Sequence, residues 1–554
     1  MLGSLIKFPS FALLLALLPE TISAAEPLQP NREILDKPLT TQKLVLAHYM
    51  TAMLPCSEGE LAWLDLDLYY PNGRAAKLGG LWQTAPMCMF LLGKRRPPLA
   101  KSVLRDIRAA KQLGIDGFHF FYPCHTHDGF MQKYARIIET FFQVAGKDFP
   151  DFKLTLCLCN PRGGSPAEKI RRWSRHIRGI LSNTKDSTCW LKTPDGRTVF
   201  YLWVPDALAE GPGKKRARDP VDQIRRVATA YEDLSRSIGI DTAYIYHVRW
   251  PQKPARMKAV LDYFPAIWGW TDNLDNAKDW LRLAKLCKKR KRDYTQTVYP
   301  DYYTSKLYDK ATHRLLFKPE EILKKDPEQL QREYQVCKLS HVYRKLLERA
   351  IDTKASLINF TTWNDYPEGH HLAPEINHNF GFALILEYYK NIWQGHAHRN
   401  DREAAIVFFK KYAHAKKPQP FSIAYKIKRQ VDSEACEDII EVVTILKQPA
   451  DLYVNGKHRG KARRGLVSTT MPLQAGPVKV EVKRRGKTVM QLITPEWVTD
   501  RPYRTDRLTY CYSTRFAEIY KRIFGDTKPP VSDEYVTGED GIPNWQKRRK
   551  TSQP

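Results

Sequence analysis

The chain has 554 residues, which is too long for one ordinary domain and long enough to bury a large core. Apolar residues make up 43% and aromatic residues 11%, which excludes a largely disordered chain, and a mean hydropathy of −0.49 excludes a polytopic membrane protein. Lys and Arg number 89 against 60 Asp and Glu, a formal charge of +29, so nucleic acid is the first partner to test.

The first 25 residues have the pattern of a secretory signal peptide. Lys7 gives a short basic start, residues 11–18 are apolar, and small residues at Ser23-Ala24-Ala25 form a cleavage site. The apolar run is shorter than the roughly 20 residues that cross a bilayer. A buried N-terminal helix is the alternative. We expect a secreted or periplasmic protein with no membrane span, and export would remove it from genomic DNA, so we expect no nucleic-acid partner.

The ten cysteines contain no C-x-x-C pair, so a structural zinc finger or ribbon is not expected. One or two disulfides are possible after export. Cys157 and Cys159 lie two apart in a predicted strand and would point to the same face, where they would pack as small apolar groups.

Eight short apolar runs, rich in β-branched and aromatic residues, alternate with helix-length amphipathic segments. The runs cover residues 43–50, 115–122, 152–159, 198–204, 242–248, 263–269, 293–299 and 355–362. The amphipathic segments cover residues 99–113, 130–145, 166–182, 219–238, 274–288, 325–351 and 376–394. Continuous apolar runs are typical of parallel strands covered on both faces. The pattern predicts an α/β fold, a (β/α)8 TIM barrel over residues 40–398.

A doubly wound open sheet is the structural alternative to the barrel. No G-x-G-x-x-G follows the first strand and no G-x-x-x-x-G-K-[ST] occurs, so neither nucleotide-binding fold has its fingerprint. Pro194-Asp195-Gly196 predicts a hairpin within 188–203. The segment 51–97 is unusually long for a connection, and we expect it to lie over the catalytic face of the barrel.

The pattern changes after about residue 400. Residues 402–415 read as one more helix, and residues 420–495 contain short β-type runs with turns at Asn455-Gly456 and Arg485-Gly486. We therefore expect a helix plus a small antiparallel β-sandwich-like domain over 399–524. Residues 525–554 read as a basic polar tail, frayed in solvent.

Function in such a barrel lies at the carboxyl ends of the strands, where this chain places aromatic residues beside a few carboxylates and histidines. Aromatic faces pack on sugar rings, and carboxylates and amides bind hydroxyl groups. The sharpest feature is Asp365-x-x-Glu368 after the eighth strand, flanked by Trp363, Asn364 and His370. Two carboxyl groups are what glycoside hydrolysis needs, one protonated and one ionised. The alternative for an isolated D-x-x-E is plain surface solvation.

The run His125-Thr126-His127-Asp128 after the second strand has three interpretations. Two histidines and a carboxylate could bind a metal, His125 could contact substrate, or the loop could simply pack. The H-x-H pair of barrel metallohydrolases normally lies on strand one, where this chain has only His48, so we expect neither a metal nor another cofactor. No G-x-S-x-G elbow is present, which disfavours a serine hydrolase of that type.

Several of these motifs resemble glycoside hydrolase family 71, the endo-1,3-α-glucanases or mutanases. Thr362-Trp363-Asn364-Asp365-Tyr366-Pro367-Glu368 resembles the family's W-N-D-Y-G-E-S-H-Y signature, and Ala47-His48-Tyr49-Met50 is similar to its first strand, A-H-[FY]-M. Gly114–Phe118 is similar to the second strand and Tyr263–Trp268, more loosely, to the sixth. The order of the motifs matches too, over roughly 43–395. Thr494-Pro495-Glu496-Trp497 is similar to an accessory β-domain of some members.

The resemblance implies that Asp365 and Glu368 are the catalytic carboxylates of an inverting hydrolysis, with Glu368 as general acid and Asp365 as base. It also implies a polysaccharide substrate, and we expect a monomer. Further candidates for substrate contact under the resemblance are His48, Tyr49, Asp116, Asn160, Trp268 and Tyr303, beside His125, Trp363, Asn364 and His370. For Asp116, inside a strand, a structural role is the alternative.

The chain departs from the family signature at Pro367 and Gly369. Glu368-Gly369-His370-His371-Leu372-Ala373-Pro374 also resembles the E-G-x-x-L-x-P run of family 99-like proteins, which cleave α-mannosides, so an endo-α-mannosidase or mannanase is an alternative. A non-catalytic carbohydrate-binding protein on a decayed barrel is a second alternative. A binder of nucleic acid or another acidic polymer, motivated by the charge alone, is a third.

Overall fold

Eight parallel strands close into a barrel in the computed structural model, in the order β1-β11-β7-β6-β5-β4-β3-β2. Their bounds are β1 Leu44–Tyr49, β2 Gly117–Pro123, β3 Lys153–Cys159, β4 Thr198–Trp203, β5 Thr242–His247, β6 Ala266–Trp268, β7 Asp293–Val298 and β11 Leu357–Phe360. The structure describes residues 32–530 except 59–64, 71–72, 93–94, 160, 162, 213–215, 250–253, 272–276, 317, 419–422, 431–436, 503–504 and 506.

Amphipathic helices surround the barrel, and their apolar sides pack on the outer faces of the strands. They are α4 Leu99–Gln112, α5 Asp128–Asp148, α6 Pro166–Thr184, α7 Pro220–Ile238, α8 Pro254–Tyr263, α9 Ala277–Lys289, α11 His341–Asp352 and α12 Gly381–Trp393, with a short α1 at Arg32–Leu35 before the barrel. Local sequence fixes several starts. Ser165 and Glu168 form a capping box around Pro166, and the Asp219 side chain caps α7. The predicted (β/α)8 barrel is confirmed.

Two insertions lie at the carboxyl ends of the strands. The first is the long segment after β1, with the short helices α2 Leu66–Tyr69 and α3 Met87–Leu92. Thr84 Oγ1 donates to Tyr366 O at 2.7 Å, and Met87 N donates to Pro374 O at 2.9 Å. The described part of the segment 51–97 around Thr84 and Met87 therefore lies against the loop that follows the eighth barrel strand, on the face where it was expected.

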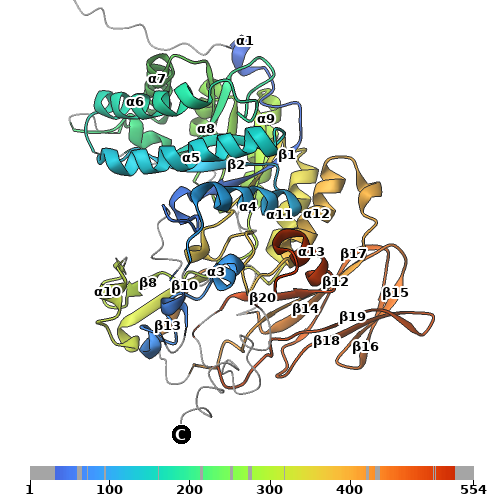
Figure 1. Ribbon diagram of the computed structural model, residues 1–554. Coiled ribbons are helices and arrows are strands. Elements are labelled where there is room, and N and C mark those ends of the chain that lie inside the picture. The colour runs from blue at the N-terminus through green and yellow to red at the C-terminus, as the bar shows by residue number, and fades with distance from the viewer. Residues whose placement is uncertain are drawn as a thin grey trace, which may run out of the picture.

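The second insertion follows β7 and forms a small sheet, visible at the lower left of Figure 1. The sheet order is β13-β10-β8-β9. The insertion supplies β8 Leu307–Asp309, β9 Leu315–Leu316, β10 Leu330–Val336 and the short helix α10 Pro319–Ile322, whereas β13 Ala424–Gln430 comes from beyond the barrel. The helix predicted over 325–351 is wrong in its first half, because Leu330–Val336 is a strand whose first five residues alternate between buried and half-buried. Side chains that alternate in burial every second residue are typical of a strand, and here this pattern prevails over the helical spacing of the apolar residues.

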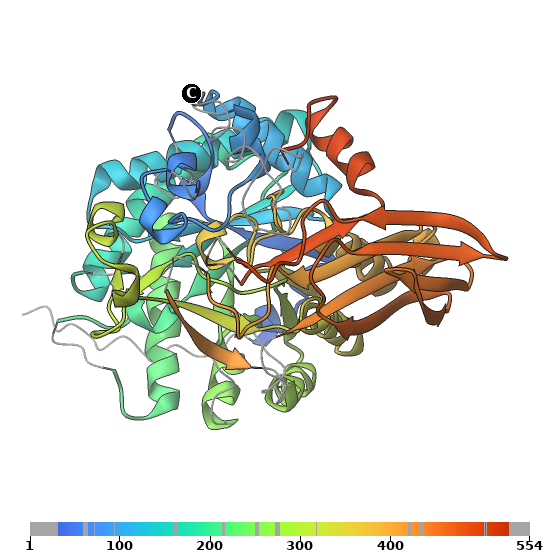
Figure 2. The ribbon, with the colours of Figure 1, turned by 90° about the horizontal axis from the view of Figure 1, so that it is seen from below.

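Two four-stranded antiparallel sheets follow the barrel and project from its side (Figure 2). Their orders are β17-β14-β12-β20 and β16-β15-β18-β19. The bounds are β12 Ala404–Lys410, β14 Ile439–Leu446, β15 Ala450–Val454, β16 Lys457–Ala462, β17 Gly465–Pro472, β18 Lys479–Arg484, β19 Lys487–Ile493 and β20 Thr509–Ser513. The predicted antiparallel β-domain after the barrel is confirmed.

The helix predicted over 402–415 is wrong, since Ala404–Lys410 is the inner strand β12. All seven of its residues are buried, with one face against the barrel helices and the other in the sandwich. A continuous apolar run that is covered on both sides is compatible with a central strand or with a helix. The β-branched and aromatic residues of this run favour the strand.

The predicted turns at Asn455-Gly456 and Arg485-Gly486 join β15 to β16 and β18 to β19, with positive φ at all four residues. The hairpin predicted within 188–203 is present as an antiparallel bridge between Lys192 and Thr198. A last helix, α13 Phe516–Phe524, packs back on α4.

The predicted signal peptide lies outside the described residues, and so does most of the predicted tail, from residue 531 on. Within the described part, no helix is long and apolar enough to cross a membrane. The nine cysteines described there are all buried, and the sulfur atoms of Cys157 and Cys159 lie 3.6 Å apart.

Candidate active site

The loop after β11 brings the predicted carboxylates together at the carboxyl end of the barrel. Asp365 N donates to Thr362 Oγ1 at 2.9 Å, and Tyr366–Glu368 then form one 3-10 turn that contains Pro367. Because the chain curls at this turn, one carboxylate oxygen of Asp365 and one of Glu368 lie within 4.8 Å of each other and of a His370 ring nitrogen. The sequence spacing alone could not fix this, since two residues three apart in an extended chain point to opposite faces.

Glu368 is held by two side chains from different parts of the loops. Lys306 Nζ lies 2.5 Å from its Oε1, and His370 Nε2 lies 2.8 Å from its Oε2. Burial acts to raise the pKa of Glu368, but the Lys306 charge and the His370 hydrogen bond outweigh it and hold that pKa well below the usual range. Glu368 is therefore the ionised member of the pair.

Asp365 has the opposite environment. Its side chain is buried, and its Oδ1 has no hydrogen-bond partner among the described residues. Burial and the negative charge of Glu368 raise the pKa of Asp365, against the smaller effects of Lys306 and His370. The two carboxyl groups thus have pKa values pushed in opposite directions, which is the arrangement that lets one hold a proton while the other stays charged.

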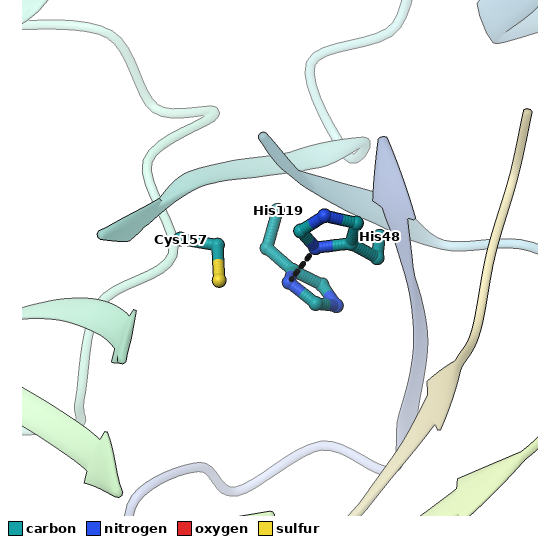
Figure 3. Close-up of side chains that lie close together, drawn as sticks. All are labelled: His48, His119 and Cys157. Atoms are coloured by element: carbon teal, nitrogen blue, oxygen red, sulfur yellow. Dashed lines mark hydrogen bonds between the residues drawn. The ribbon is translucent and has the colours of Figure 1, made fainter. Parts of the chain in front are cut away.

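Inward-facing side chains of the barrel lie below this loop. Figure 3 shows His48 of β1 and His119 of β2 meeting in the barrel interior, with Cys157 of β3 pointing toward the same space. The two Nδ1 atoms lie 3.2 Å apart. His119 also stacks on Tyr201 with ring centroids 4.0 Å apart, and Trp268 meets both of those rings at 5.3 Å. These residues form a polar and aromatic floor.

Three histidines of this floor keep an unpaired nitrogen. His48, His119 and His247 each have an Nε2 atom that is buried and makes no hydrogen bond within the described part of the chain. Burial lowers the pKa of His48 and of His247 to about 3, so both rings are neutral at neutral pH. A neutral imidazole can donate or accept at Nε2, depending on its tautomer, which suits hydroxyl groups.

Aromatic rings connect this floor with the histidine beside the carboxylates. Trp270 lies 4.8 Å from His48 and 6.0 Å from His370, centroid to centroid, and Tyr302 lies 5.7 Å from His370. Aromatic faces beside unpaired polar atoms and a carboxyl pair are the composition of a carbohydrate site.

Two groups of side chains in this region have the chemistry of metal ligands. His48, His119 and Cys157 bring their donor atoms within 4.8 Å, as do Asp365, Glu368 and His370. In the first group the Nδ1 atoms of the two imidazoles are hydrogen-bonded to each other. In the second, the Lys306 ammonium beside Glu368 already supplies the positive charge. Both fit hydrogen bonding to a neutral ligand better than binding of a cation.

Five of the predicted site residues meet in this region: Asp365, Glu368, His370, His48 and Trp268. Trp268 is fixed by its Nε1, which donates to Leu202 O at 2.8 Å. His125 is exposed in the loop after β2, where its Nδ1 accepts from His127 N at 3.1 Å. The structure does not support a metal site in that loop, because the Asp128 carboxylate forms ion pairs with Arg175 and His176. Asn160 lies outside the described residues.

Three predicted contacts lie behind the site. Tyr49 alternates with His48 and points out of the barrel, where its hydroxyl donates to Asp106 Oδ2 at 2.9 Å. Trp363 Nε1 donates to the same oxygen at 3.2 Å. Asn364 binds the main chain of Met50 through both of its amide atoms, at 2.7 and 3.2 Å. These three side chains fasten the loop after β11 to the end of β1 and to α4.

Two further predicted contacts lie away from the site. Asp116 is at the amino end of the barrel, where its carboxylate accepts from Val45 N at 2.8 Å and Lys390 Nζ at 2.6 Å, so its role is structural. Tyr303 is buried on the side of the C-terminal sheets, and its hydroxyl donates to Thr505 O at 2.8 Å. Its neighbour Tyr302 faces His370 instead, because adjacent residues of an extended segment point to opposite sides.

The sequence reasoning missed Lys306, His119, Tyr302 and Trp270. His119 could have been found, because it is the inward-facing position of β2 that pairs with His48 in the register of the two strands. Trp270 and Tyr302 follow strands six and seven, and only their neighbours were chosen. Lys306 gives no local signal, since it lies eight residues beyond the end of β7.

The chain was compared with curated proteins and with solved structures. No curated protein matches the chain. Among solved structures, it is similar to the GH99 endo-α-mannosidase from Bacteroides thetaiotaomicron, with 12% identity, 64% of this chain and 99% of that chain covered, and a TM-score of 0.41. It is also similar to a glycosyl hydrolase family 2 member from Bacteroides cellulosilyticus DSM 14838, with 10% identity, 82% and 46% covered, and a TM-score of 0.40. Similarity this distant carries no argument about substrate.

The family comparison is decisive. The sequence model of glycosyl hydrolase family 71 matches residues 83–506, more than half of the chain, including both carboxylates and the C-terminal sheets up to β19. The resemblance in the strand-end motifs is thereby confirmed. The chain belongs to glycosyl hydrolase family 71, the α-1,3-glucanase family, and is a glycoside hydrolase.

Proposed function

We propose that this glycoside hydrolase is an exported endo-1,3-α-glucanase that uses Asp365 and Glu368 to cleave α-1,3-glucan. The observation that carries the choice of residues is the opposite direction of their two pKa values. Burial raises the pKa of Asp365, while Lys306 and His370 hold the pKa of Glu368 well below its usual range despite burial. One proton donor and one ionised carboxylate are what the reaction requires.

These directions favour a division of roles opposite to the one that the resemblance implies. In our proposal Asp365 gives its proton to the glycosidic oxygen as the C1–O bond breaks. Glu368 takes a proton from the water whose oxygen attacks C1, and proton exchange with solvent restores the starting state. Lys306 is a positioning residue that keeps Glu368 charged before the sugar binds.

The stereochemical outcome has less support from the free protein. Inverting glycosidases hold their carboxyl groups about 6.5–9.5 Å apart, and retaining enzymes about 5–5.5 Å. The nearest oxygens of Asp365 and Glu368 lie within 4.8 Å. Inversion, which the family resemblance implies, requires room for a water molecule between the two carboxyl groups when the sugar enters.

Substrate contacts follow from the unpaired groups of the barrel floor. We assign His48, His119 and His247 to sugar hydroxyl groups through their free Nε2 atoms. Trp270 and Tyr302, whose rings both contact His370, are assigned to the faces of the sugar rings.

The activity is tested by incubating the purified protein with insoluble α-1,3-glucan and measuring the reducing ends that are released. Asp365→Asn and Glu368→Gln should each lower kcat by about 10²–10⁴-fold. Near-normal turnover in both variants would refute the site. Release from α-mannan instead of α-1,3-glucan would assign the chain to α-mannoside cleavage. If the glycan retards the protein in affinity electrophoresis but no product is released, the chain is a non-catalytic carbohydrate-binding protein.

Export rests on the sequence of residues 1–25 alone. Expression with the native N-terminus should give protein outside the cytoplasm whose first residue, by N-terminal sequencing, lies close to residue 26. A retained Met1 would refute export. We also propose that the enzyme acts as a monomer without nucleic acid, so a single-chain mass in solution and no binding to DNA at physiological salt are expected.

A further inference from the structure

A second cluster of ligand-type side chains lies directly behind the catalytic loop. It consists of His371, Glu375 and His378, all buried, whose donor atoms lie within 4.8 Å of one another. His370 and His371 are neighbours in an extended stretch, so His370 faces Glu368 while His371 faces this cluster. The cluster is therefore a separate feature on the back of the same loop.

The cluster carries more unpaired polar atoms than its own residues can satisfy. Neither nitrogen of His371, neither nitrogen of His378, and not Oε2 of Glu375 makes a hydrogen bond within the described residues. The nearest approaches are 3.7 Å between His371 Nε2 and Glu375 Oε1 and 3.6 Å between His378 Nε2 and Asp301 Oδ2, both too long. Five buried atoms without partners in one place are rare in native proteins and call for a ligand.

The main chain holds these side chains in place. Glu375 Oε1 accepts from the backbone N–H groups of Asn377, at 2.9 Å, and of His378. Asn377 O accepts from Cys511 N at 2.9 Å, and Asn379 Nδ2 donates to Cys511 O at 2.7 Å. The segment is thus fixed to strand β20, and the remaining oxygen of Glu375 is left over beside the two rings.

Aromatic rings and the Asp301 carboxylate surround the cluster, and among the described residues no Lys or Arg forms an ion pair with Glu375. The Tyr366 and Phe382 rings pack against His371 and His378 at 4.8 and 5.2 Å. The Lys410 ammonium contacts Asp301, the carboxylate beside His378, and is engaged there and by Arg507 O and Thr509 Oγ1. Among the described side chains, Glu375 has an ion-pair contact only with His371. A buried carboxylate in such a setting needs a positive partner.

We propose that His371, Glu375 and His378 bind a divalent transition-metal ion. Two imidazole nitrogens and one carboxylate oxygen form a borderline donor set that suits Zn²⁺, with a water as the fourth ligand. The ion would neutralise Glu375 and satisfy one nitrogen of each ring. Its role is structural, because it would fasten the loop that carries Asp365 and Glu368 to the C-terminal sheet. It takes no part in the proposed hydrolysis, and its presence does not depend on the substrate.

Metal content tests the proposal directly. The full chain, produced without a histidine tag and dialysed against metal-free buffer, should retain about one zinc ion per chain by mass spectrometry. The double variant His371→Ala/His378→Ala should lose that ion. His458→Ala, which removes an exposed histidine of β16, is the matched control and should keep it. A wild-type chain with no bound zinc even after incubation with ZnCl₂ would overturn the proposal.

A second measurement avoids the chance that the double variant fails to fold. Wild-type protein stripped with a chelator should unfold at a lower temperature, and added Zn²⁺ should restore the original midpoint, since a ligand of the native state stabilises it. Added Co²⁺ should give the visible absorption of a four-coordinate site with nitrogen and oxygen ligands. If the midpoint is insensitive to chelator and metal and Co²⁺ gives no such band, the cluster holds water and the proposal fails.

Discussion

Lys306 Nζ lies 2.5 Å from Glu368 Oε1, and this ion pair joins the two loops that follow neighbouring strands of the barrel. Lys306 follows β7 and Glu368 follows β11, and these strands pair in parallel with Phe360 opposite Val298. The lysine therefore reaches the carboxylate because the barrel closes, although 62 residues separate them in the chain. Its charge decides which of the two carboxyl groups stays ionised.

Replacing Lys306 with Met should move the acidic limb of the pH profile upward. Lys306 lowers the pKa of Glu368, so without it Glu368 takes up a proton at a higher pH. Activity that needs the ionised carboxylate is present above that pKa and lost below it, so kcat/KM should fall earlier as the pH decreases. Profiles of wild type and Lys306→Met on soluble α-1,3-glucan oligosaccharides measure this.

Lys310→Met is the matched control for Lys306→Met. Lys310 is an exposed lysine four residues further along the same insertion, and its removal should leave the acidic limb unchanged. An unchanged limb in Lys306→Met as well would show that the ion pair does not control Glu368.

The roles of the two carboxyl groups can be separated with an activated leaving group. A fluoride leaving group needs little protonation, so an α-1,3-glucan oligosaccharyl fluoride bypasses the general acid. If Asp365 is the acid, Asp365→Asn should recover most of its lost rate on the fluoride, while Glu368→Gln should remain about 10²–10⁴-fold impaired. Recovery in Glu368→Gln instead would reverse the assignment.

The anomer released first reports the stereochemistry. Inversion of an α-1,3 bond gives the β-anomer before mutarotation, and proton NMR of the earliest product distinguishes it from the α-anomer. We expect the β-anomer, from the family resemblance. An initial α-anomer would mean retention, in agreement with the short separation of Asp365 and Glu368 in the free protein.

The sequence was sufficient for the barrel and for the carboxyl pair. Each parallel strand is a continuous apolar run that differs from its amphipathic neighbours, and this contrast is local, so all eight strands could be located. Asp365 and Glu368 could be found because a barrel places chemistry at strand ends. The strand at Ala404–Lys410 was predicted as a helix because a buried apolar run has the same local composition in either structure.

The direction in which a side chain points was the part that sequence could not supply. Tyr49 and His48 are adjacent, yet one faces the helices and the other the barrel interior, and a strand-end motif contains both. Tyr303 and Tyr302 differ in the same way. Lys306 is a long-range partner, and only the closure of the barrel relates its position to that of Glu368.

Glu441 anchors the C-terminal sheets to the barrel, and its removal should destabilise the protein. This buried carboxylate of β14 accepts from Arg344 Nη2 of α11 at 2.8 Å and from Ser340 N at 2.9 Å. Glu441→Ala leaves the arginine without its partner, which should cost about 3–5 kcal/mol. Ser468→Ala removes only a hydroxyl that donates to the same carboxylate, and should cost about 1 kcal/mol. Urea unfolding compares them, and equal effects would contradict the anchoring role.

Two glycine-to-alanine changes should alter stability in opposite directions. Gly381 begins α12, and a Cβ there would overlap Cys511 Sγ and come within 2.8 Å of Ile406 Cγ2. The helix would have to move away from β12 and β20, so Gly381→Ala should destabilise by about 1–3 kcal/mol.

Gly179, in the middle of α6, provides the matched control, because a Cβ there meets nothing within 4 Å. Gly179→Ala should stabilise the protein by about 0.5–1 kcal/mol through helix propensity alone. Both variants carry the same chemical change in a helix, so the sign of the shift in the thermal midpoint isolates the packing of α12 against the C-terminal sheet. A rise of the midpoint in Gly381→Ala would show that this contact has room for a methyl group.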